Sequence, residues 1–364
     1  MNLSLGIVGL PNVGKSTLFN TLTNIKVAAE NYPFCTIEPN IGIVQVPDER
    51  VSKLADIVNT KKLIYPIVEF VDIAGLVKGA HQGEGLGNQF LANIRSTNAI
   101  VHILRAFESE KIVHVENRID PLNDKEIVET ELILKDLESI NQKLQKIAEE
   151  VRRDKKKEKY LNLLFQIKAL LERGSLINGL AYSEDAEVNK FRKELFLITD
   201  KPVLYLLNID EVAFEKNELI NKYSKILNVS PQLIIPMNIK QENELSLLSD
   251  EEKVEVQNEL GLKFRALDDL IKSSYDLLEL ITFFTAGEQE ARGWTIKNGY
   301  TAPQAAGTIH TDFEKKFIAA EVVNYEDFVK FNGWLGSRAV GKSRIEGKEY
   351  VFKDGDVALF RHGA

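Results

Sequence analysis

Residues 9–17 read Gly-Leu-Pro-Asn-Val-Gly-Lys-Ser-Thr: a glycine, four free positions and then Gly-Lys-Ser. This spacing is typical of a loop that cradles the phosphates of a nucleotide. An apolar run at residues 3–8 predicts a buried strand before the loop, and an amphipathic pattern from Ser16 onward predicts a helix after it. The alternative is a chance glycine turn between a strand and a helix. Such a turn would not explain why a Lys-Ser pair follows the second glycine. The stretch therefore predicts a nucleoside-triphosphate site in an α/β sheet.

Each residue type in this loop has a chemical reason. Gly9 and Gly14 let the backbone curl so that successive N–H groups face an anion. We expect Lys15 to reach the β- and γ-phosphates and to stabilise negative charge there during catalysis. We expect Ser16 to offer its hydroxyl to Mg²⁺ at the positive end of the helix.

Bulk composition narrows the protein class. The chain has 364 residues, 44% of them hydrophobic and 27% charged, which predicts an ordinary globular protein of two or three domains. A net charge of −8 argues against a generic nucleic-acid coat. The single cysteine, Cys35, excludes a disulfide framework or Cys-based zinc site and fits a reducing compartment. No membrane span or signal peptide is evident, so we expect a cytoplasmic protein.

Beyond the loop, strand and helix patterns alternate along the sequence, as in a doubly wound, mainly parallel sheet. A helix is expected at residues 88–97, following a glycine-rich segment. The expected later strands are at residues 40–46, 64–71, 99–104, 202–207 and 232–237.

Two other regions interrupt or follow this pattern. Residues 124–197 have apolar residues at helical spacing and predict an inserted helical hairpin or short coiled coil, with a basic turn at residues 152–157. That turn is either a solvated helix end or a contact site. An acidic linker helix is expected at residues 246–272. The aromatic and β-branched residues 282–364 predict a small α+β domain, with a helix starting at Asp312.

Asp72 and Thr36 are candidates for the Mg²⁺ site. Asp72 ends an apolar strand in Asp-Ile-Ala-Gly, and phosphoryl-transfer sites need a carboxylate there to hold the metal. Thr36 lies in the loop before the second strand and could be a metal-binding switch threonine or an exposed loop hydroxyl.

The sequence Asn208-Ile209-Asp210-Glu211 bears on the base. A guanine site of this class carries Asn, Lys, any residue and Asp, with the aspartate accepting hydrogen bonds from the base. Here isoleucine replaces the lysine, and the terminal carboxylate is one methylene longer. We therefore favour adenine, read by backbone groups near Ile209, because a carboxylate facing adenine N1 would cost about 1–3 kcal/mol. The alternative is that Glu211 points away and guanine still binds.

The position where a Ras-like site carries a water-orienting glutamine is Leu76. Leucine cannot orient water, so intrinsic hydrolysis should be slow. His81 and His114 are the candidates to supply the missing group, and a structural role for either is the alternative.

These strings resemble the YchF-type Obg-like ATPases, a branch of the Obg GTPase family, along the whole chain. The matching stretches are residues 9–17, 70–90, 208–211, 283–287 and 301–317. The resemblance implies a nucleotide-binding domain at residues 1–123 and 198–270, an inserted helical coiled coil at 124–197, and a β-grasp-like TGS domain at 280–364.

The resemblance also implies site residues and partners. Its phosphate-binding positions are Asn12, Val13, Gly14, Lys15, Ser16 and Thr17, with Asn208 and Ile209 at the base. Ser16, Thr36 and Asp72 are the expected Mg²⁺ positions, and His114 is the expected catalytic histidine. ATP is the implied substrate and K⁺ a further candidate cofactor. The implied partner is the ribosome, at its large subunit and ribosomal RNA, with no membrane contact, and a monomer is expected.

Three functional hypotheses remain open at this point. The first is a slow ATPase that acts as a nucleotide-controlled switch on the ribosome. The second is a binding module in which ATP is a ligand and hydrolysis is incidental. The third is a conventional GTPase.

Overall fold

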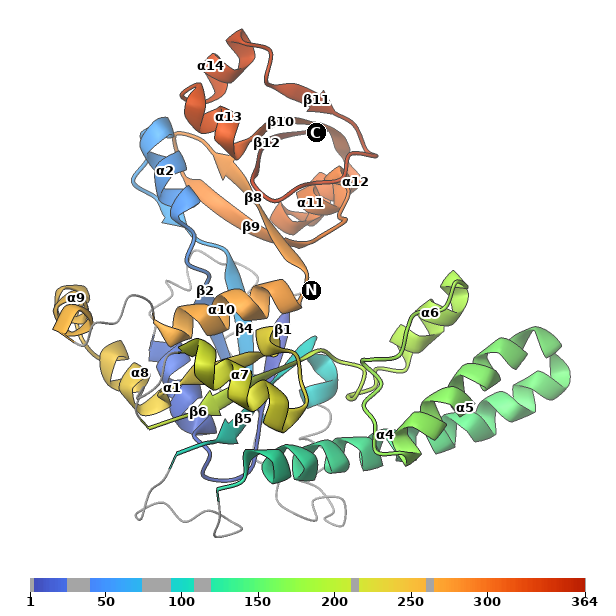
Figure 1. The fold of residues 1–364 in the computed structure, drawn as a ribbon. Coiled ribbons are helices and arrows are strands. Elements are labelled where there is room, and N and C mark those ends of the chain that lie inside the picture. The colour runs from blue at the N-terminus through green and yellow to red at the C-terminus, as the bar shows by residue number, and fades with distance from the viewer. Residues whose placement is uncertain are drawn as a thin grey trace.

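The computed structural model describes residues 3–24, 40–73, 93–107, 119–210, 216–259 and 265–363. These residues form a first six-stranded sheet, a helical arm and a second six-stranded sheet (Figure 1). Among the helices in these ranges, none has the length and apolar character needed to cross a membrane.

The first sheet has the strand order β2-β4-β1-β5-β6-β7. All neighbouring strands run parallel except β2, which is antiparallel to β4. Strands β1, β5, β6 and β7 are buried throughout, as expected of a parallel sheet covered on both faces. The bounds are β1 Ser4–Val8, β2 Ile41–Gln45, β4 Ile67–Asp72, β5 Ala99–Arg105, β6 Val203–Asn208 and β7 Ile234–Met237.

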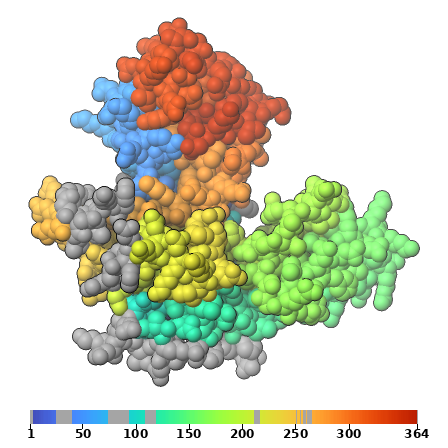
Figure 2. Space-filling view, in the orientation of Figure 1, coloured from blue at the N-terminus to red at the C-terminus, as the bar shows by residue number. Residues whose placement is uncertain are grey.

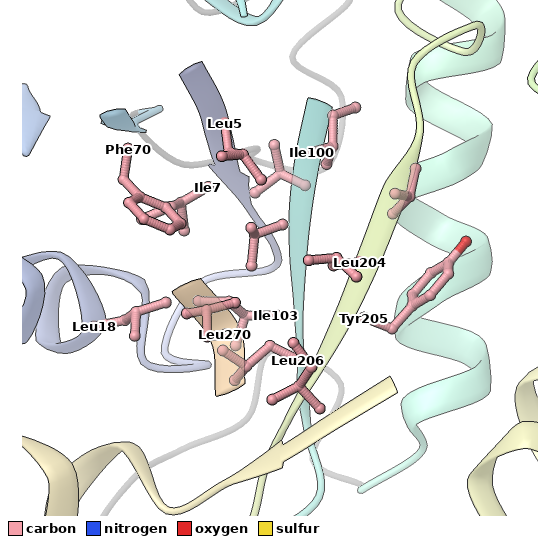
Figure 3. Close-up of a cluster of buried hydrophobic side chains, with 14 of the residues drawn as sticks. Leu5, Ile7, Leu18, Phe70, Ile100, Ile103, Leu204, Tyr205, Leu206 and Leu270 are labelled. Atoms are coloured by element: carbon pink, nitrogen blue, oxygen red, sulfur yellow. The ribbon is translucent and has the colours of Figure 1, made fainter. Parts of the chain in front are cut away.

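Helices cover both faces of this sheet, which confirms the predicted doubly wound architecture. In Figure 3, Leu18 and Leu270 lie beside Ile103, whereas Tyr205 points toward the helix on the opposite side. The Tyr205 hydroxyl donates to Glu129 Oε1 at 2.8 Å. The helices are α1 Lys15–Asn24, α7 Lys216–Leu227, α8 Ile239–Ser246, α9 Asp250–Glu259 and α10 Ala266–Leu277, with a 3-10 turn, η4, at Pro231–Leu233.

The expected acidic linker helix is not a linker. It is two helices, α9 and α10, and α10 buries Leu267, Leu270 and Ile271 to 1% exposure or less in the core of the first sheet. The acidic residues that suggested a linker lie on its outer face, where Asp269 pairs with Lys216 at 2.5 Å. The amphipathic period of residues 266–277, rather than their charge, was the informative signal.

The helical arm consists of α4 Pro121–Arg153, a 3-10 turn η3 Lys155–Lys157, α5 Glu158–Glu172 and α6 Ala186–Glu194. Asp120 caps α4 by accepting from the Asn123 N–H at 3.1 Å, and proline at the first helical position suits that start. The arm has its own core, built from Ile133, Ile140, Ile147, Leu163, Leu164, Ile167, Leu171, Ile177, Val188 and Leu197. The predicted helical hairpin is thus present.

The second sheet has the order β11-β10-β12-β8-β9-β3. One face packs on α11 and α12, and the other packs on α13, α14 and α2. Phe283 and Phe284 alternate across β8 and enter these two cores separately. The bounds are β3 Leu63–Ile64, β8 Leu280–Ala286, β9 Ala291–Lys297, β10 Phe317–Asn324, β11 Arg344–Glu346, β12 Asp356–His362, α2 Glu49–Val58, α11 Ala302–Ile309, α12 Thr311–Lys315, α13 Tyr325–Lys330 and α14 Trp334–Ala339.

One expected strand is in fact two. The apolar run at residues 64–71 is divided at Pro66, so that β3 ends at Ile64 and β4 begins at Ile67. Proline lacks the N–H that a continuous ladder needs. The two strands belong to different sheets, since β3 pairs with β9 and β4 pairs with β1 and β2.

Candidate functional site

The phosphate loop connects β1 to α1 as predicted. Its glycines have backbone angles that other residues rarely adopt, with φ of +154° at Gly9 and +107° at Gly14. A Cβ at Gly14 would lie 2.8 Å from Asn208 Nδ2, and one at Gly9 would lie 2.7 Å from the Ile103 carbonyl oxygen. Both positions therefore require glycine for conformation and for space.

Lys15 closes the loop on itself. Its Nζ donates to the carbonyls of Gly9 at 2.9 Å and Leu10 at 2.7 Å. Burial lowers the Lys15 pKa, and the Asp72 carboxylate opposes this effect. The ammonium group is therefore positioned at the loop with part of its hydration removed, where its attraction to a phosphate is strengthened.

Asp72 reaches the same place from β4, which pairs with β1 so that Asp72 lies opposite Ile7. Burial raises the Asp72 pKa, and Lys15 lowers it. Lys15 and Asp72 are 57 positions apart in the sequence. Because β1 and β4 are adjacent, the two charges lie close enough for each to shift the pKa of the other.

Ser16 and Asp72 fit a Mg²⁺ ion by donor type. A hydroxyl and one carboxylate are hard oxygen ligands, and Mg²⁺ in phosphoryl-transfer sites takes its other ligands from phosphates and water. Within the described ranges, no group of three or more His, Cys, Asp or Glu side chains could hold a metal.

Asn208 has a role that the sequence pattern did not reveal. At the end of β6, its Nδ2 donates to the Val13 carbonyl at 2.9 Å, and its Oδ1 accepts from the Ile239 N–H at 3.3 Å. The side chain is 7% exposed and Val13 is fully buried. Asn208 therefore joins the phosphate loop to the first turn of α8.

The segment expected to read the base is held by a second asparagine. Asn238 Nδ2 donates to the Asp210 carbonyl, and its Oδ1 accepts from the Gln241 N–H at 3.0 Å as the cap of α8. The Ile209 N–H already donates to the Met237 carbonyl at 3.0 Å. A base read at Ile209 would therefore meet its carbonyl or a later N–H.

Asn238 was not singled out from the sequence. An asparagine between a buried strand and a helical pattern is, however, a recognisable helix cap, and that signal could have found it. Several predicted residues lie outside the described part of the chain: Thr36, Leu76, His81, His114 and Glu211.

His102 is a histidine on which the charge of Lys15 acts. It lies in β5, is 2% exposed, and its ring centroid is 5.8 Å from that of Tyr205. Burial, with smaller contributions from Lys125 and Lys15, lowers its pKa to about 3. A neutral imidazole enclosed in the sheet is a packing residue rather than a proton-transfer group.

Two family models match the chain. One is described as a 50S ribosome-binding GTPase and matches residues 4–166; the other is the C-terminal model of the YchF GTPases, described as a protein of unknown function, and matches residues 280–363. The first match includes the phosphate loop, and the second includes β8 to β12.

Relatives align over nearly the full length. Proteins named ribosome-binding ATPase YchF from Haemophilus influenzae and Bacillus subtilis are each 47% identical, over 362 and 365 residues, covering 99% of both chains. The solved Schizosaccharomyces pombe YchF GTPase has a TM-score of 0.86 at 38% identity and covers 99% of this chain and 98% of that one. A GTP-binding protein from Pyrococcus horikoshii, with a TM-score of 0.60 at 18% identity, shares the fold. The full-length identity and the matched phosphate loop show that this chain belongs to the YchF family of P-loop proteins.

Proposed function

We propose that this chain is a Mg²⁺-dependent ATPase that binds the ribosome and hydrolyses ATP slowly. In this proposal it is a cytoplasmic, nucleotide-controlled switch in translation regulation or a stress response. The observation that supports the proposal is the phosphate-loop sequence, with Lys15 hydrogen-bonded to the loop and acting on the pKa of Asp72, in a chain 47% identical to relatives named ribosome-binding ATPase.

ATP rather than GTP is the proposed substrate. The bacterial relatives are named as ATPases, whereas the solved S. pombe protein is named a GTPase. The chemistry of Asn208-Ile209-Asp210-Glu211 favours adenine, since it lacks the lysine and the shorter terminal carboxylate of a guanine site. The Ile209 carbonyl could accept from the exocyclic amino group of adenine.

In the proposed reaction, residues 12–17 bind the phosphates and Lys15 stabilises the charge that develops on the transferred group. Ser16, Thr36 and Asp72 hold Mg²⁺, which neutralises phosphate charge when it is bound. His114 orients the attacking water in place of the glutamine that Leu76 replaces. The chain acts as a monomer and contacts the large subunit through ribosomal RNA, and K⁺ is a candidate second cation.

Phosphate release from ATP and from GTP, with and without Bacillus subtilis ribosomes, tests the proposal. We expect slow turnover of ATP that ribosomes stimulate, and co-sedimentation that depends on the bound nucleotide. Turnover unaffected by ribosomes, together with no co-sedimentation in either nucleotide state, would refute it.

Leu76 also favours a second candidate, a binding module in which hydrolysis is incidental. The variant His114→Ala separates the two. Unchanged ATP turnover would support the binding module. A loss of at least about tenfold in turnover would support the switch; this threshold lies below the usual contribution of a proton-transfer group to the rate.

A further inference from the structure

The helical arm places a basic turn far from the nucleotide site. Helix α4 has 33 residues, which corresponds to a length of about 50 Å. Figures 1 and 2 show the arm standing out from the first sheet, with the turn between α4 and α5 at its outer end. The apolar core of the arm is continuous along α4 and α5, so the turn is presented on a rigid support.

The root of the arm is fixed by buried polar contacts. Asp136 accepts from the N–H groups of Ile198 at 3.2 Å and Thr199 at 2.8 Å, and from the Thr199 hydroxyl at 2.7 Å. Arg192 pairs with Asp200 at 2.5 Å and donates to the Ile177 carbonyl at 3.0 Å. These contacts join α4 and α6 to the segment that leads into β6, and Val128 and Leu132 of α4 pack in the core of the first sheet.

We name residues 152–157, at this outer end, the arm tip. It contains five cationic side chains and one carboxylate, a net charge of +4. The whole chain carries −8, so the remainder carries −12. The arm tip is therefore a concentrated positive feature on an acidic molecule.

Two lysines in or next to the arm tip form ion pairs that stabilise the turn. Lys157 pairs with Glu150 at 2.6 Å, and the nearby Lys159 pairs with Asp185 at 2.8 Å and Glu187 at 2.5 Å. Asp154 caps the turn by accepting from the Lys156 N–H at 3.0 Å. These contacts account for the local conformation.

Four cations are not used in this way. Across the described ranges, no ion pair involves Arg152, Arg153, Lys155 or Lys156, and all four side chains are exposed. Arg152 and Arg153 lie in the last turn of α4, where the helix dipole favours cations. Lys155 and Lys156 lie beyond that helix, and four like charges in little more than one turn repel one another. Their arrangement points to an external anion.

We infer that Arg152, Arg153, Lys155 and Lys156 bind the phosphate backbone of a ribosomal RNA helix. This inference rests on the proposed ribosome-binding function and names its contact surface. Successive residues of a 3-10 turn point about 120° apart, so the lysines fan outward and can meet phosphates on both sides of a groove. Backbone phosphates of RNA are bound in this manner without reading bases.

Two features favour RNA over an acidic protein surface. Protein interfaces have an apolar centre, and no large apolar side chain is exposed between residues 143 and 160. RNA would also repel the acidic remainder of the chain. This repulsion would orient the protein so that the arm tip faces the RNA.

The test is co-sedimentation of the full chain with Bacillus subtilis ribosomes at increasing KCl. The variant Arg152→Gln/Arg153→Gln/Lys155→Gln/Lys156→Gln removes the four cations. The matched control, Lys222→Gln/Lys225→Gln/Lys330→Gln/Lys348→Gln, makes the same charge change at exposed lysines elsewhere. Basal ATP turnover without ribosomes checks that both variants fold.

We expect the arm-tip variant to bind at least about tenfold more weakly, with the slope of log affinity against log salt reduced by about 0.9 for each phosphate that is no longer neutralised. The control should bind like the wild type. Equal binding and equal salt dependence of the arm-tip variant would overturn the inference while leaving the proposed function intact. Failure of the wild type to bind would instead refute the proposed function.

A photocrosslink distinguishes RNA from protein. The variant Lys156→p-azidophenylalanine, irradiated on the ribosome, should yield adducts with ribosomal RNA. Adducts confined to ribosomal proteins would overturn the choice of RNA.

Discussion

At the residue scale, the nucleotide site depends on an asparagine that links separate segments. Asn208 donates to the Val13 carbonyl at 2.9 Å and accepts from the Ile239 N–H at 3.3 Å. Its amide group also limits position 14 to glycine, because a Cβ there would lie 2.8 Å from Nδ2. The conformation of the phosphate loop therefore depends in part on Asn208, the last residue of β6.

The variant Asn208→Ala should weaken ATP binding. It leaves the Val13 carbonyl and the Ile239 N–H buried without these partners, at a cost of about 1–3 kcal/mol, or roughly fivefold to 150-fold in Kd. Titration with a fluorescent ATP analogue measures the change, and Asn221→Ala, at an exposed position of α7, is the control. Equal affinity for both variants would contradict the linking role.

His102 makes the fold sensitive to acid. Its folded-state pKa is lowered to about 3 by burial, whereas the unfolded chain protonates near pH 6.5. The unfolded state therefore binds more protons below pH 6.5, and the free energy of unfolding falls as pH decreases toward 3.

Between pH 8 and pH 5, wild-type protein should lose about 2 kcal/mol more than the variant His102→Leu. Urea unfolding of both proteins at the two pH values measures this difference. Parallel losses in the two proteins would show that His102 does not titrate in this way.

At the element scale, local patterns predicted the first sheet well. Residues 3–8, 99–104 and 202–207 are apolar runs between turn signals, and β1, β5 and β6 follow them closely. The phosphate loop was predictable because its residue types and their spacing carry the chemistry.

Other elements depended on contacts distant in sequence. The short β3 has no periodicity of its own and exists because it pairs with β9, more than 200 residues later. The linking roles of Asn208 and Asn238 likewise arise only when β6, β7 and the phosphate loop come together. Spacing within one segment does not encode such contacts.

The arm should loosen when its root is altered. Asp136→Asn replaces one of the two accepting carboxylate oxygens with an NH2 group, which cannot accept from a backbone N–H, at a cost of about 1.5–3 kcal/mol. Hydrogen exchange at the Ile198 and Thr199 amides should accelerate accordingly. Glu138→Gln, on the same helix but exposed, is the control, and equal protection in both variants would contradict the anchoring role.

At the scale of the whole molecule, an N-terminal segment completes the C-terminal unit. Helix α2 buries Val51 and Leu54 against β8 and α13, and Arg50 reaches Asp354 at 2.6 Å. Gly293 of β9 admits Pro66, because a Cβ there would lie 2.7 Å from the proline ring. Residues 49–64 thus pack with the second sheet, although the sequence alone grouped them with residues 1–123.

The variant Leu54→Ala should destabilise the second sheet by about 2–5 kcal/mol, the usual range for a buried leucine. Both tryptophans of the chain, Trp294 and Trp334, belong to this unit, so tryptophan fluorescence during urea unfolding reports on it directly. Lys53→Ala, exposed on the same helix, is the control. A fluorescence midpoint unchanged by Leu54→Ala would show that α2 is not part of this unit.

We propose that this phosphate loop, which matches a GTPase family model, serves ATP. The most direct measurement is competition of ATP and GTP for a bound fluorescent ATP analogue in the presence of Mg²⁺. We predict that ATP displaces the analogue at a concentration at least about fivefold lower than GTP does, which corresponds to the lower end of a mismatch of about 1–3 kcal/mol. Displacement by GTP at an equal or lower concentration would show that the site does not prefer adenine.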